Sequence, residues 1–376
     1  MPYKRNIFWH MEAIHRCLPS FEADARMNFH NLTLYVGARN RYHFMQPQFI
    51  VWINGHPAYS PTIGPGTRGG FIGWLPYFNK RWPAGSGKLA FKDLCLAQDI
   101  PTPRMWRSAA EADRPYVVKP FNASFGMGLR GPFHPGASSP TALFGGEQAY
   151  AEEFVAGRIA KIWFWDAKPA CLEIAEMPTV TGNGVDTFAQ LVARSTVPGT
   201  PPIDADYLRA IARFQSSDLD AVPPPGTTLM AEIRYGSGLA QPSMENANLL
   251  QRHAHDVLGQ QLLRYGPLFW NSIPAEFRQN TLYTVDAIID AQNQFWFLEM
   301  NCNPSSHPDV YPLMFEGLFG APGIPVPEAP NSASNSDQFR QNLMTFRPQQ
   351  GIPDYSRQLP PPGSPPQYRR GPVSGA

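Results

Sequence analysis

The segment that most constrains this chain lies near residue 290, where two apolar runs flank a short polar stretch. Residues 281–304 read TLYTVDAIIDAQNQFWFLEMNCNP. The β-branched residues before Ile289 and the aromatic residues leading to Met300 are typical of strands, and the polar residues 290–293 are typical of a turn. The segment therefore predicts a β-hairpin.

Each predicted strand carries one acid, and the two acids face each other if the turn is centred near Gln292. Asp286 then lies opposite Glu299, and because side chains alternate along a strand, Asn301 lies on the same face as Glu299. Glu299 stands inside the apolar run FWFLEM, where a carboxylate is rarely buried without a partner. Carboxylate and amide oxygens are ligands that Mg²⁺ accepts. We therefore expect Asp286, Glu299 and Asn301 to bind Mg²⁺.

A second group of residues is suited to binding phosphate. Lys119 lies at the end of PYVVKP (115–120), which predicts a short buried strand, and the small-residue loop ASFGMG follows. An ammonium group and the backbone N–H groups of a glycine-containing loop can both bind phosphate oxygens. Lys88, in the predicted helix GKLAFKDLCLAQ (87–98), offers a second cation. Arg234, in LMAEIRYGSG, offers a third, because a buried arginine needs an anion.

The rest of the chain up to about residue 320 mixes helix and strand patterns. FIVWING (49–55) predicts a strand, and residues 151–175 predict a strand, a turn at Gly157 and two further strands. Helices are predicted for DTFAQLVARS, for DADYLRAIARFQ and, as the longest amphipathic helix, for NLLQRHAHDVLGQQLLRYG (248–266). This mixture predicts an α+β fold with largely antiparallel sheets. The aromatic residues of 1–80 are expected mostly to fill a core.

Composition bounds the class of protein. A chain of 376 residues with a net charge of +1 can hold two or three domains, and no nucleic-acid partner is expected because no excess of positive charge covers it. It has no apolar run of about 18 residues and no apolar N-terminal run typical of a signal peptide, so no membrane partner is expected. Four widely spaced cysteines favour reduced thiols and a cytoplasmic protein. These are Cys17, Cys95, Cys171 and Cys302.

The C-terminal end differs in composition from the rest. Many of the 41 prolines follow residue 320, in GAPGIPVPEAPNSASNSDQ and QLPPPGSPPQYRRGPVSGA. Such segments can bury little apolar surface, so residues 321–376 are predicted to be a flexible or disordered tail. The alternative is that PPPGSPP docks a proline-binding partner.

The order of the motifs resembles the ATP-grasp superfamily. The motifs are K-x(3)-K-x(6)-IPTP, VVKP with its Ser/Gly loop, EEFVAGR, P-x-V-x-G-x-G-x-x-T, E-x-R and VD-x(12)-E-x-N-x-NP, within about residues 80–310. The segment MPTVTGNGVDTFAQLV is most similar to carboxylate–amine ligases related to cyanophycin synthetase and the ribosomal-protein glutamate ligases. The closing segment is also similar to D-alanine–D-alanine ligase.

This resemblance implies an ATP-grasp fold of three subdomains, with ATP between two antiparallel sheets. The expected parts are an N-terminal substrate-side domain (1–85), a central subdomain (86–151), a C-terminal subdomain with the metal site (152–320) and the tail (321–376). The implied reaction uses ATP and Mg²⁺ to activate a carboxylate as an acyl phosphate, which an amine then converts to an amide or peptide bond. Small-molecule or peptide carboxylates and amines are the implied substrates, and a homodimer is common among similar enzymes.

The resemblance also implies roles for individual residues. Arg234 and Lys119 are the catalytic candidates, with Arg234 stabilising the transferring phosphoryl group. The residues expected to contact the ATP phosphates are Lys88, Lys119, Ser124, Phe125, Gly126 and Gly128. The hinge beside the adenine is expected at Glu152, Glu153, Phe154 and Val155. His307 lies in the loop after the metal strand, where relatives contact the substrate.

Two departures from the family pattern leave other functions open. Asn183 replaces an acid in the Gly-Asn-Gly segment, and Ile159 stands where relatives carry an acid that holds the ribose. Ile159 favours the alternative of an adaptor that binds nucleotide without turnover, whereas three converging metal ligands disfavour it. A carboxylate kinase, which needs no amine, is the other alternative.

Overall fold

The protein is described here from a computed structural model. The described residues are 7–38, 41–53, 56–64, 66–67, 69–121, 126–137, 149–197, 203–234, 239 and 248–322. The chain divides into two compact units, Met1–Val326 and Pro327–Ala376, and the described residues all belong to the first. The predicted tail lies outside the described residues from residue 323 onward, and the division into four parts stays a prediction.

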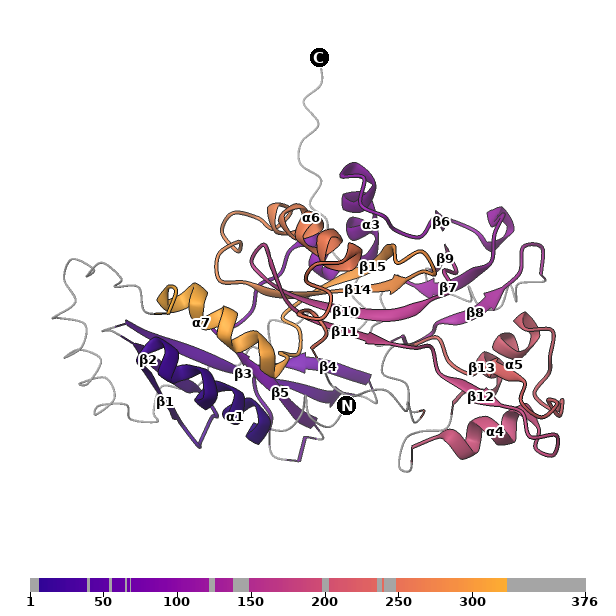
Figure 1. Ribbon diagram of the computed structural model, residues 1–376, viewed down its shortest axis with the longest axis horizontal. Helices are drawn as coiled ribbons and strands as arrows, with labels where there is room; N and C mark the ends of the chain where they lie inside the picture. Colours follow the sequence, from indigo (N-terminus) through magenta and orange to yellow (C-terminus); the bar gives the residue numbers. More distant parts are fainter. Residues whose placement is uncertain are drawn as a thin grey trace, which may run out of the picture. The chain divides into compact units, whose positions relative to one another are not determined.

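The N-terminal part of the chain forms a five-stranded sheet. Its strands are β1 (Ala23–Met27), β2 (Leu34–Ala38), β3 (Arg41–Ile53), β4 (His56–Ser60) and β5 (Gly69–Leu75), with β3 pairing with β2, β4 and β5. One face of the sheet packs against α1 (Ile7–Cys17) and against α7 (Tyr311–Phe319) from the other end of the described chain (Figure 1). Met45, Phe49 and Val51 alternate along β3 and point into this core.

Most of the aromatic residues expected in that core are not there. Phe49 is buried, but Phe8, Tyr42, Phe44 and Trp52 are exposed. The last three occupy the even-numbered positions of β3, so they lie on the face opposite the helices. The expectation was wrong because a strand has two faces, and only the side chains on the face toward the helices enter the core.

A second sheet, of four strands, carries the predicted hairpin. Its order is β11 (Lys168–Ala175), β10 (Arg158–Trp165), β14 (Leu282–Ile289) and β15 (Phe295–Cys302). One face packs against α3 (Lys88–Ala97), which follows the short α2 (Pro83–Ser86), and against α6 (Val257–Asn271). Phe91, Phe164 and Phe269 lie in this core. On the other face, Trp163 and Trp165 pack into the N-terminal core. The same face carries Lys161, Asp286 and Glu299.

The hairpin has the predicted pairing of its two acids, but its turn differs in length from the prediction. Asp286 lies opposite Glu299, as expected. The turn is one residue longer than predicted, because the Asp290 carboxylate accepts hydrogen bonds from the backbone N–H groups of Gln292 and Gln294. A β-bulge beside the two acids takes up the extra residue, so their pairing is preserved.

Two further sheets complete the described strands. One has the order β6 (Met105–Trp106), β9 (Ala149–Glu153), β7 (Tyr116–Pro120) and β8 (Arg130–Phe133); the other pairs β12 (Thr179–Thr181) with β13 (Thr228–Met230). The latter shares a core with α4 (Phe188–Ser195) and α5 (Ala205–Phe214). Short 3₁₀ helices cover Leu18–Phe21, Ala109–Glu111 and Pro308–Val310. All strand pairings among the described residues are antiparallel, which agrees with the predicted α+β class.

The longest helix begins later than predicted, at Val257 and not at residue 248. The cause is Asp256, whose carboxylate accepts hydrogen bonds from the N–H groups of Leu258 and Gly259 and so caps the helix at that point. His253, predicted to lie on the helix, precedes it and bonds to Asp256 at 2.6 Å. The helical spacing of apolar residues therefore extends on the N-terminal side beyond the first residue of the helix.

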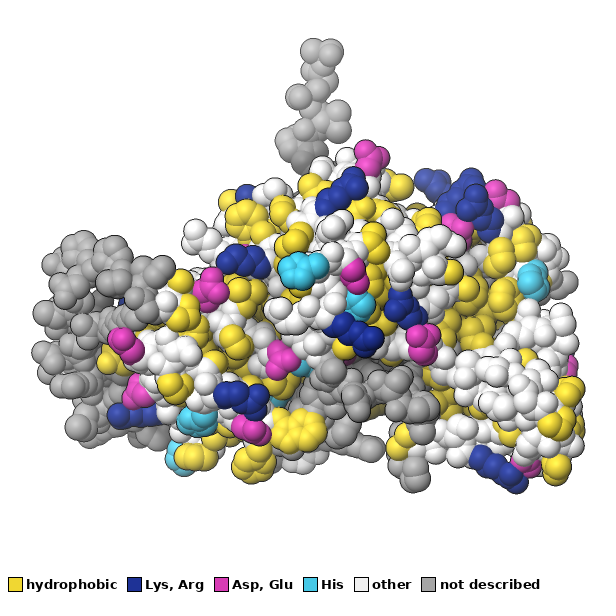
Figure 2. Space-filling model, viewed as in Figure 1, with side chains coloured by type: hydrophobic (Ala, Val, Ile, Leu, Met, Phe, Trp, Pro, Cys, Tyr) yellow, Lys and Arg dark blue, Asp and Glu magenta, His cyan; other side chains and the backbone are white. Residues whose placement is uncertain are grey.

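The surface carries mixed charge. On the face shown in Figure 2, basic and acidic side chains are interspersed among the described residues. Within the described part of the chain, no helix combines the length and the apolar character needed to cross a bilayer.

Candidate functional site

A cavity of about 340 Å³ has walls from three of the sheets. Strands β3, β4 and β5 supply one wall, β7 and β9 another, and β10, β14 and β15 a third. Ligand pockets in proteins commonly measure about 300–1,000 Å³. Most of the predicted site residues line this cavity: Lys88, Lys119, Gly126, Glu152, Glu153, Phe154, Val155, Arg234, Asp286, Glu299 and Asn301. Ser124 and Phe125 lie outside the described residues.

The three predicted metal ligands meet on one wall of this cavity. Asn301 Nδ2 donates to Asp286 Oδ2 at 3.2 Å, which leaves the amide oxygen of Asn301 for another partner. Burial and the nearby Asp286 carboxylate raise the pKa of Glu299. No cluster of three or more His, Cys, Asp and Glu side chains suited to a metal occurs among the described residues, so a metal at this wall would need a ligand of another type, such as the Asn301 amide oxygen. Two close carboxylates and an amide oxygen fit Mg²⁺, whose charge would relieve their repulsion.

Lys161 is a site residue that the sequence reasoning missed. It is buried on β10 directly opposite Asp286, and its Nζ lies 2.6 Å from Asp286 Oδ1. Burial alone would lower the pKa of Lys161, but the Asp286 carboxylate outweighs burial and raises it. The signal was present, because Lys161 interrupts the apolar run RIAKIWFW just as Glu299 interrupts FWFLEM.

A buried acid holds Lys119 in place. Glu152, on β9, is fully enclosed and forms ion pairs with Lys119 on β7 and with Lys92 on α3, the latter at 2.8 Å. Burial would raise the pKa of Glu152, but the two ammonium groups outweigh it and hold the pKa below its ordinary value. Lys92 belongs to the K-x(3)-K motif, yet the sequence did not indicate that it shares an acid with Lys119.

Two backbone N–H groups of the predicted hinge form hydrogen bonds with other backbone groups of the protein. The Glu153 N–H donates to Arg104 O and the Phe154 N–H donates to Pro115 O, each at 2.8 Å. These two N–H groups are therefore not available to a bound base. The wall around the hinge is apolar, and Ile159, at the position of the family's ribose-binding acid, is one of its buried side chains.

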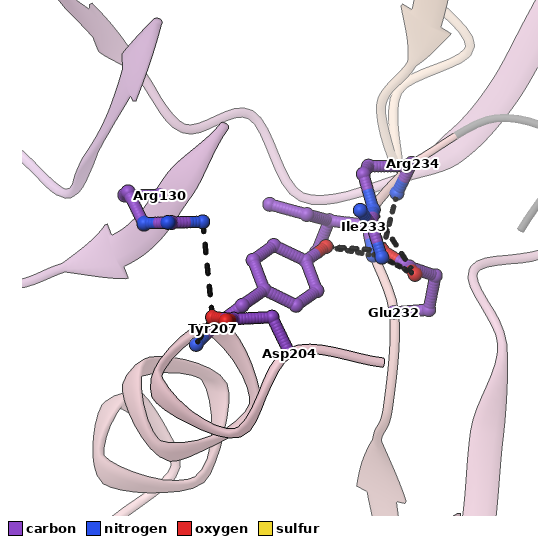
Figure 3. A network of polar contacts seen from close by, with 6 residues as sticks. All are labelled: Arg130, Asp204, Tyr207, Glu232, Ile233 and Arg234. Atoms are coloured by element: carbon purple, nitrogen blue, oxygen red, sulfur yellow. Dashed lines mark hydrogen bonds and ion pairs between the residues drawn. The ribbon is translucent and has the colours of Figure 1, made fainter. Parts of the chain in front are cut away.

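Arg234 reaches the cavity from the segment after β13. Its guanidinium is held by the fully buried Glu232, with Nη2 2.7 Å from Oε2, and it stacks over the Tyr207 ring at 4.3 Å (Figure 3). The Tyr207 hydroxyl donates to the same carboxylate. Glu232 outweighs burial and raises the pKa of Arg234. Gly126, with φ +68°, brings the loop after β7 so close that an added Cβ would lie 2.9 Å from Arg234 Cδ.

Lys88 completes the set of cations around the acids. It begins α3 and donates to Pro120 O at 3.1 Å, next to Lys119 in the chain. Burial lowers the pKa of Lys88, and the Glu299 carboxylate opposes that shift. The ammonium groups of Lys88 and Lys119 both oppose the rise in the pKa of Glu299. These cations and the two acids, Asp286 and Glu299, therefore share one electrostatic environment.

Two predicted residues lie away from the cavity lining. His307 is buried beside the Trp163 ring, and its Nδ1 accepts the backbone N–H of Asp309 at 3.1 Å, which caps the 3₁₀ helix Pro308–Val310. A substrate role for His307 stays a prediction that the cavity does not support. Gly128, with φ +70°, packs against Pro120, where an added Cβ would lie 2.7 Å from Cγ. Gly128 therefore shapes the loop.

No protein-family model matches the sequence, and no curated protein matches it. Among solved structures, the chain is similar to a bifunctional glutathione synthetase from Pasteurella multocida, with a TM-score of 0.35 and 14% identity over 79% of this chain and 41% of that one. It is also similar to D-alanine–D-alanine ligase from Bacillus anthracis (TM-score 0.31, 12% identity, 68% and 69% of the chains). A third similar structure is the ATP-grasp ligase PsnB with its minimal precursor (TM-score 0.28, 12% identity, 69% and 61%). The match thus spans less than half of the glutathione synthetase, and the structure has a distant similarity to ATP-grasp ligases.

Proposed function

We propose that this chain is an ATP- and Mg²⁺-dependent ligase that activates a carboxylate as an acyl phosphate and joins it to an amine. The observation that carries the proposal is the convergence of opposite charges in one cavity. Two acids and an amide suited to a divalent cation lie there with three cations suited to phosphate: Asp286, Glu299 and Asn301 with Lys88, Lys119 and Arg234. Phosphoryl transfer asks little of a protein beyond positioning and charge neutralisation, which is what such a set provides.

Each polar residue has a defined task in this proposal. Lys88 and Lys119 bind phosphate oxygens, and Glu152 holds Lys119 in position for that. Arg234, oriented by Glu232, stabilises the negative charge that develops on the transferring group. Mg²⁺, when bound at the wall that carries Asp286, Glu299 and Asn301, would supply further neutralisation of phosphate charge.

The N-terminal sheet supplies the wall that favours a class of substrate. Ile50, Tyr59 and Ile72 line the cavity from this side, and Ile50 pairs directly with Tyr59. Apolar side chains with one phenol suit an apolar or aromatic substituent better than a charged one. We therefore expect the activated carboxylate to carry an apolar side chain.

The test is release of ADP from Mg²⁺-ATP with a panel of amino acids and dipeptides, comparing wild type with Glu299→Ala. We expect release that requires a carboxylate and an amine together, with the largest rates for apolar carboxylates, and at least a ~10²-fold loss in the variant, as for other lost transition-state contacts. Hydroxylamine should trap the acyl phosphate as a hydroxamate. If wild type shows no Mg²⁺-dependent ATP binding, the proposal is wrong.

The alternative of nucleotide binding without turnover is favoured by one observation. Ile159 lines the cavity in the place of an acid for the ribose. An adaptor of this kind would bind Mg²⁺-ATP and release no ADP with any substrate pair. A carboxylate kinase would instead release ADP and the acyl phosphate with the carboxylate alone.

A further inference from the structure

A row of charged side chains crosses the second sheet, and three of them, Lys161, Asp286 and Glu299, line the cavity. Neighbouring strands place Glu299 opposite Asp286, Asp286 opposite Lys161 and Lys161 opposite Glu173. Side chains directly opposite each other in antiparallel strands have Cβ atoms about 4.5–5.5 Å apart. Lys161 therefore stands between two acids.

Lys161 is tied firmly into this row. Its ammonium lies 2.6 Å from Asp286 Oδ1, and it also lies 5.8 Å from the centre of the Trp163 ring. The other oxygen of Asp286 accepts the Asn301 amide at 3.2 Å. Both carboxylate oxygens of Asp286 thus have a donor from the protein itself.

Glu299 is placed differently. In the part of the chain that the structure describes, Glu299 lines the cavity and forms no ion pair at the distance of the Lys161–Asp286 pair. Its side chain is only partly buried. The Asn301 amide oxygen, left open by the bond to Asp286, lies on the same face two residues further along β15. Glu299 and Asn301 therefore present the oxygens that are open to a cation.

We infer that this cavity takes one divalent cation, held by Glu299 and Asn301, and that Lys161 provides at Asp286 the positive charge that a second cation would otherwise bring. The inference rests on the proposed function and narrows it. A cation bridging both acids would need an Asp286 oxygen at about 2.0–2.1 Å, where the buried ammonium already sits. If Lys161 moved away, a buried ammonium would lose its partner Asp286. If it stayed, the ammonium and the second cation would repel each other.

The decisive measurement is electron paramagnetic resonance of the full chain with saturating Mn²⁺ and the non-hydrolysable nucleotide AMP-PNP, because two Mn²⁺ ions a few ångströms apart couple magnetically. Wild type should show a single uncoupled ion. Lys161→Met keeps most of the length of the side chain without its charge and should show a coupled pair. Lys161→Arg keeps the charge and serves as the matched control, with a single uncoupled ion.

Two further variants keep the test independent of the buried lysine's role in folding. Asp286→Asn should retain one uncoupled Mn²⁺ with less than a tenfold change in affinity, whereas Glu299→Gln should weaken Mn²⁺ binding more than tenfold. A coupled pair in wild type, or a single ion in both wild type and Lys161→Met, would overturn the inference and leave the proposed function standing. Absence of any protein-bound Mn²⁺ and nucleotide in wild type would overturn the proposed function itself.

Discussion

Ion pairs with a buried member hold most of the charged side chains of the cavity. Glu152 holds Lys119, Glu232 holds Arg234, and Asp286 is itself held by Lys161. Each pair has one buried member, Glu152, Glu232 or Lys161, whose charge would lose all or part of its counter-charge if the partner were removed. At the scale of residues, the site is therefore a set of paired charges that keeps its cations in place before any ligand arrives.

Glu152→Gln tests this arrangement through stability. Lys92 and Lys119 would lose their shared counter-charge in an enclosed position, so we expect the free energy of unfolding to fall by about 3–5 kcal/mol. Urea denaturation measures it. Glu153→Gln is the matched control, because Glu153 pairs with the exposed Arg114, and solvent screens such a pair, so a much smaller loss is expected. Equal losses in the two variants would show that Glu152 is not the anchor described here.

The same substitution has a defined pH dependence. The folded-state pKa of Glu152 lies below the ordinary value of 4.5, so the unfolded chain binds the proton more readily than the folded one. Its stabilising contribution is therefore fully present above about pH 4.5 and is lost as the pH falls through the folded-state pKa. The difference in unfolding free energy between wild type and Glu152→Gln should stay constant from pH 7 to 5.5 and shrink below pH 4.5. A difference that grows with acidity would contradict the assignment.

At the scale of elements, the turn between β14 and β15 decides where the acids stand. Asp290 accepts hydrogen bonds from the Gln292 and Gln294 backbone and from Trp296 Nε1 at 2.8 Å. These bonds define a turn one residue longer than the residue pattern predicts, and the bulge restores the pairing of Asp286 with Glu299. Local hydrogen bonds of the turn therefore set the geometry of a site several residues away.

Asp290→Ala should weaken the hairpin as a unit. The loss of three hydrogen bonds at about 0.5–1.5 kcal/mol each predicts a total of about 1.5–4.5 kcal/mol, which urea denaturation can measure. Gln292→Ala is the control, because Gln292 takes part through its backbone and its side chain is exposed. A change of less than about 0.5 kcal/mol is usual for such a surface position. If Asp290→Ala is equally mild, the turn does not depend on that carboxylate.

At the scale of the whole molecule, segments from opposite ends of the described chain hold the cavity walls. His10 Nδ1 lies 2.8 Å from the Tyr311 hydroxyl, which also accepts the Trp74 N–H at 3.1 Å. Tyr77 donates to Leu282 O at 2.9 Å, which joins the segment after β5 to β14. The cavity therefore exists only when these distant segments are assembled, so a ligand in it should stabilise them together.

Mg²⁺ with AMP-PNP should raise the melting temperature of the wild-type chain. A ligand at about 100 times its Kd stabilises a folded protein by about 2.7 kcal/mol, and differential scanning fluorimetry measures the shift. Glu299→Ala should reduce the shift strongly. Glu316→Gln, which removes a surface pair with Lys168, should keep it. An equal shift in all three proteins would place the ligand elsewhere.

Much of the fold's local structure could be predicted, because it depends on short-range patterns. The strand around Lys119, the helix that begins at Lys88 and the hairpin with its facing acids all follow from periodicity and turn residues. The start of α6 was missed because one capping carboxylate, Asp256, outweighed the helical pattern before it.

The sequence by itself determined most of the candidate site residues, since charged residues inside apolar runs are visible without a fold. Only the tertiary structure decided how they are paired. Lys161 meets Asp286 across 125 residues of chain, and Glu152 meets Lys119 across 33. Those partners depend on which strands lie side by side, and this depends on the packing of whole sheets, which no local pattern contains.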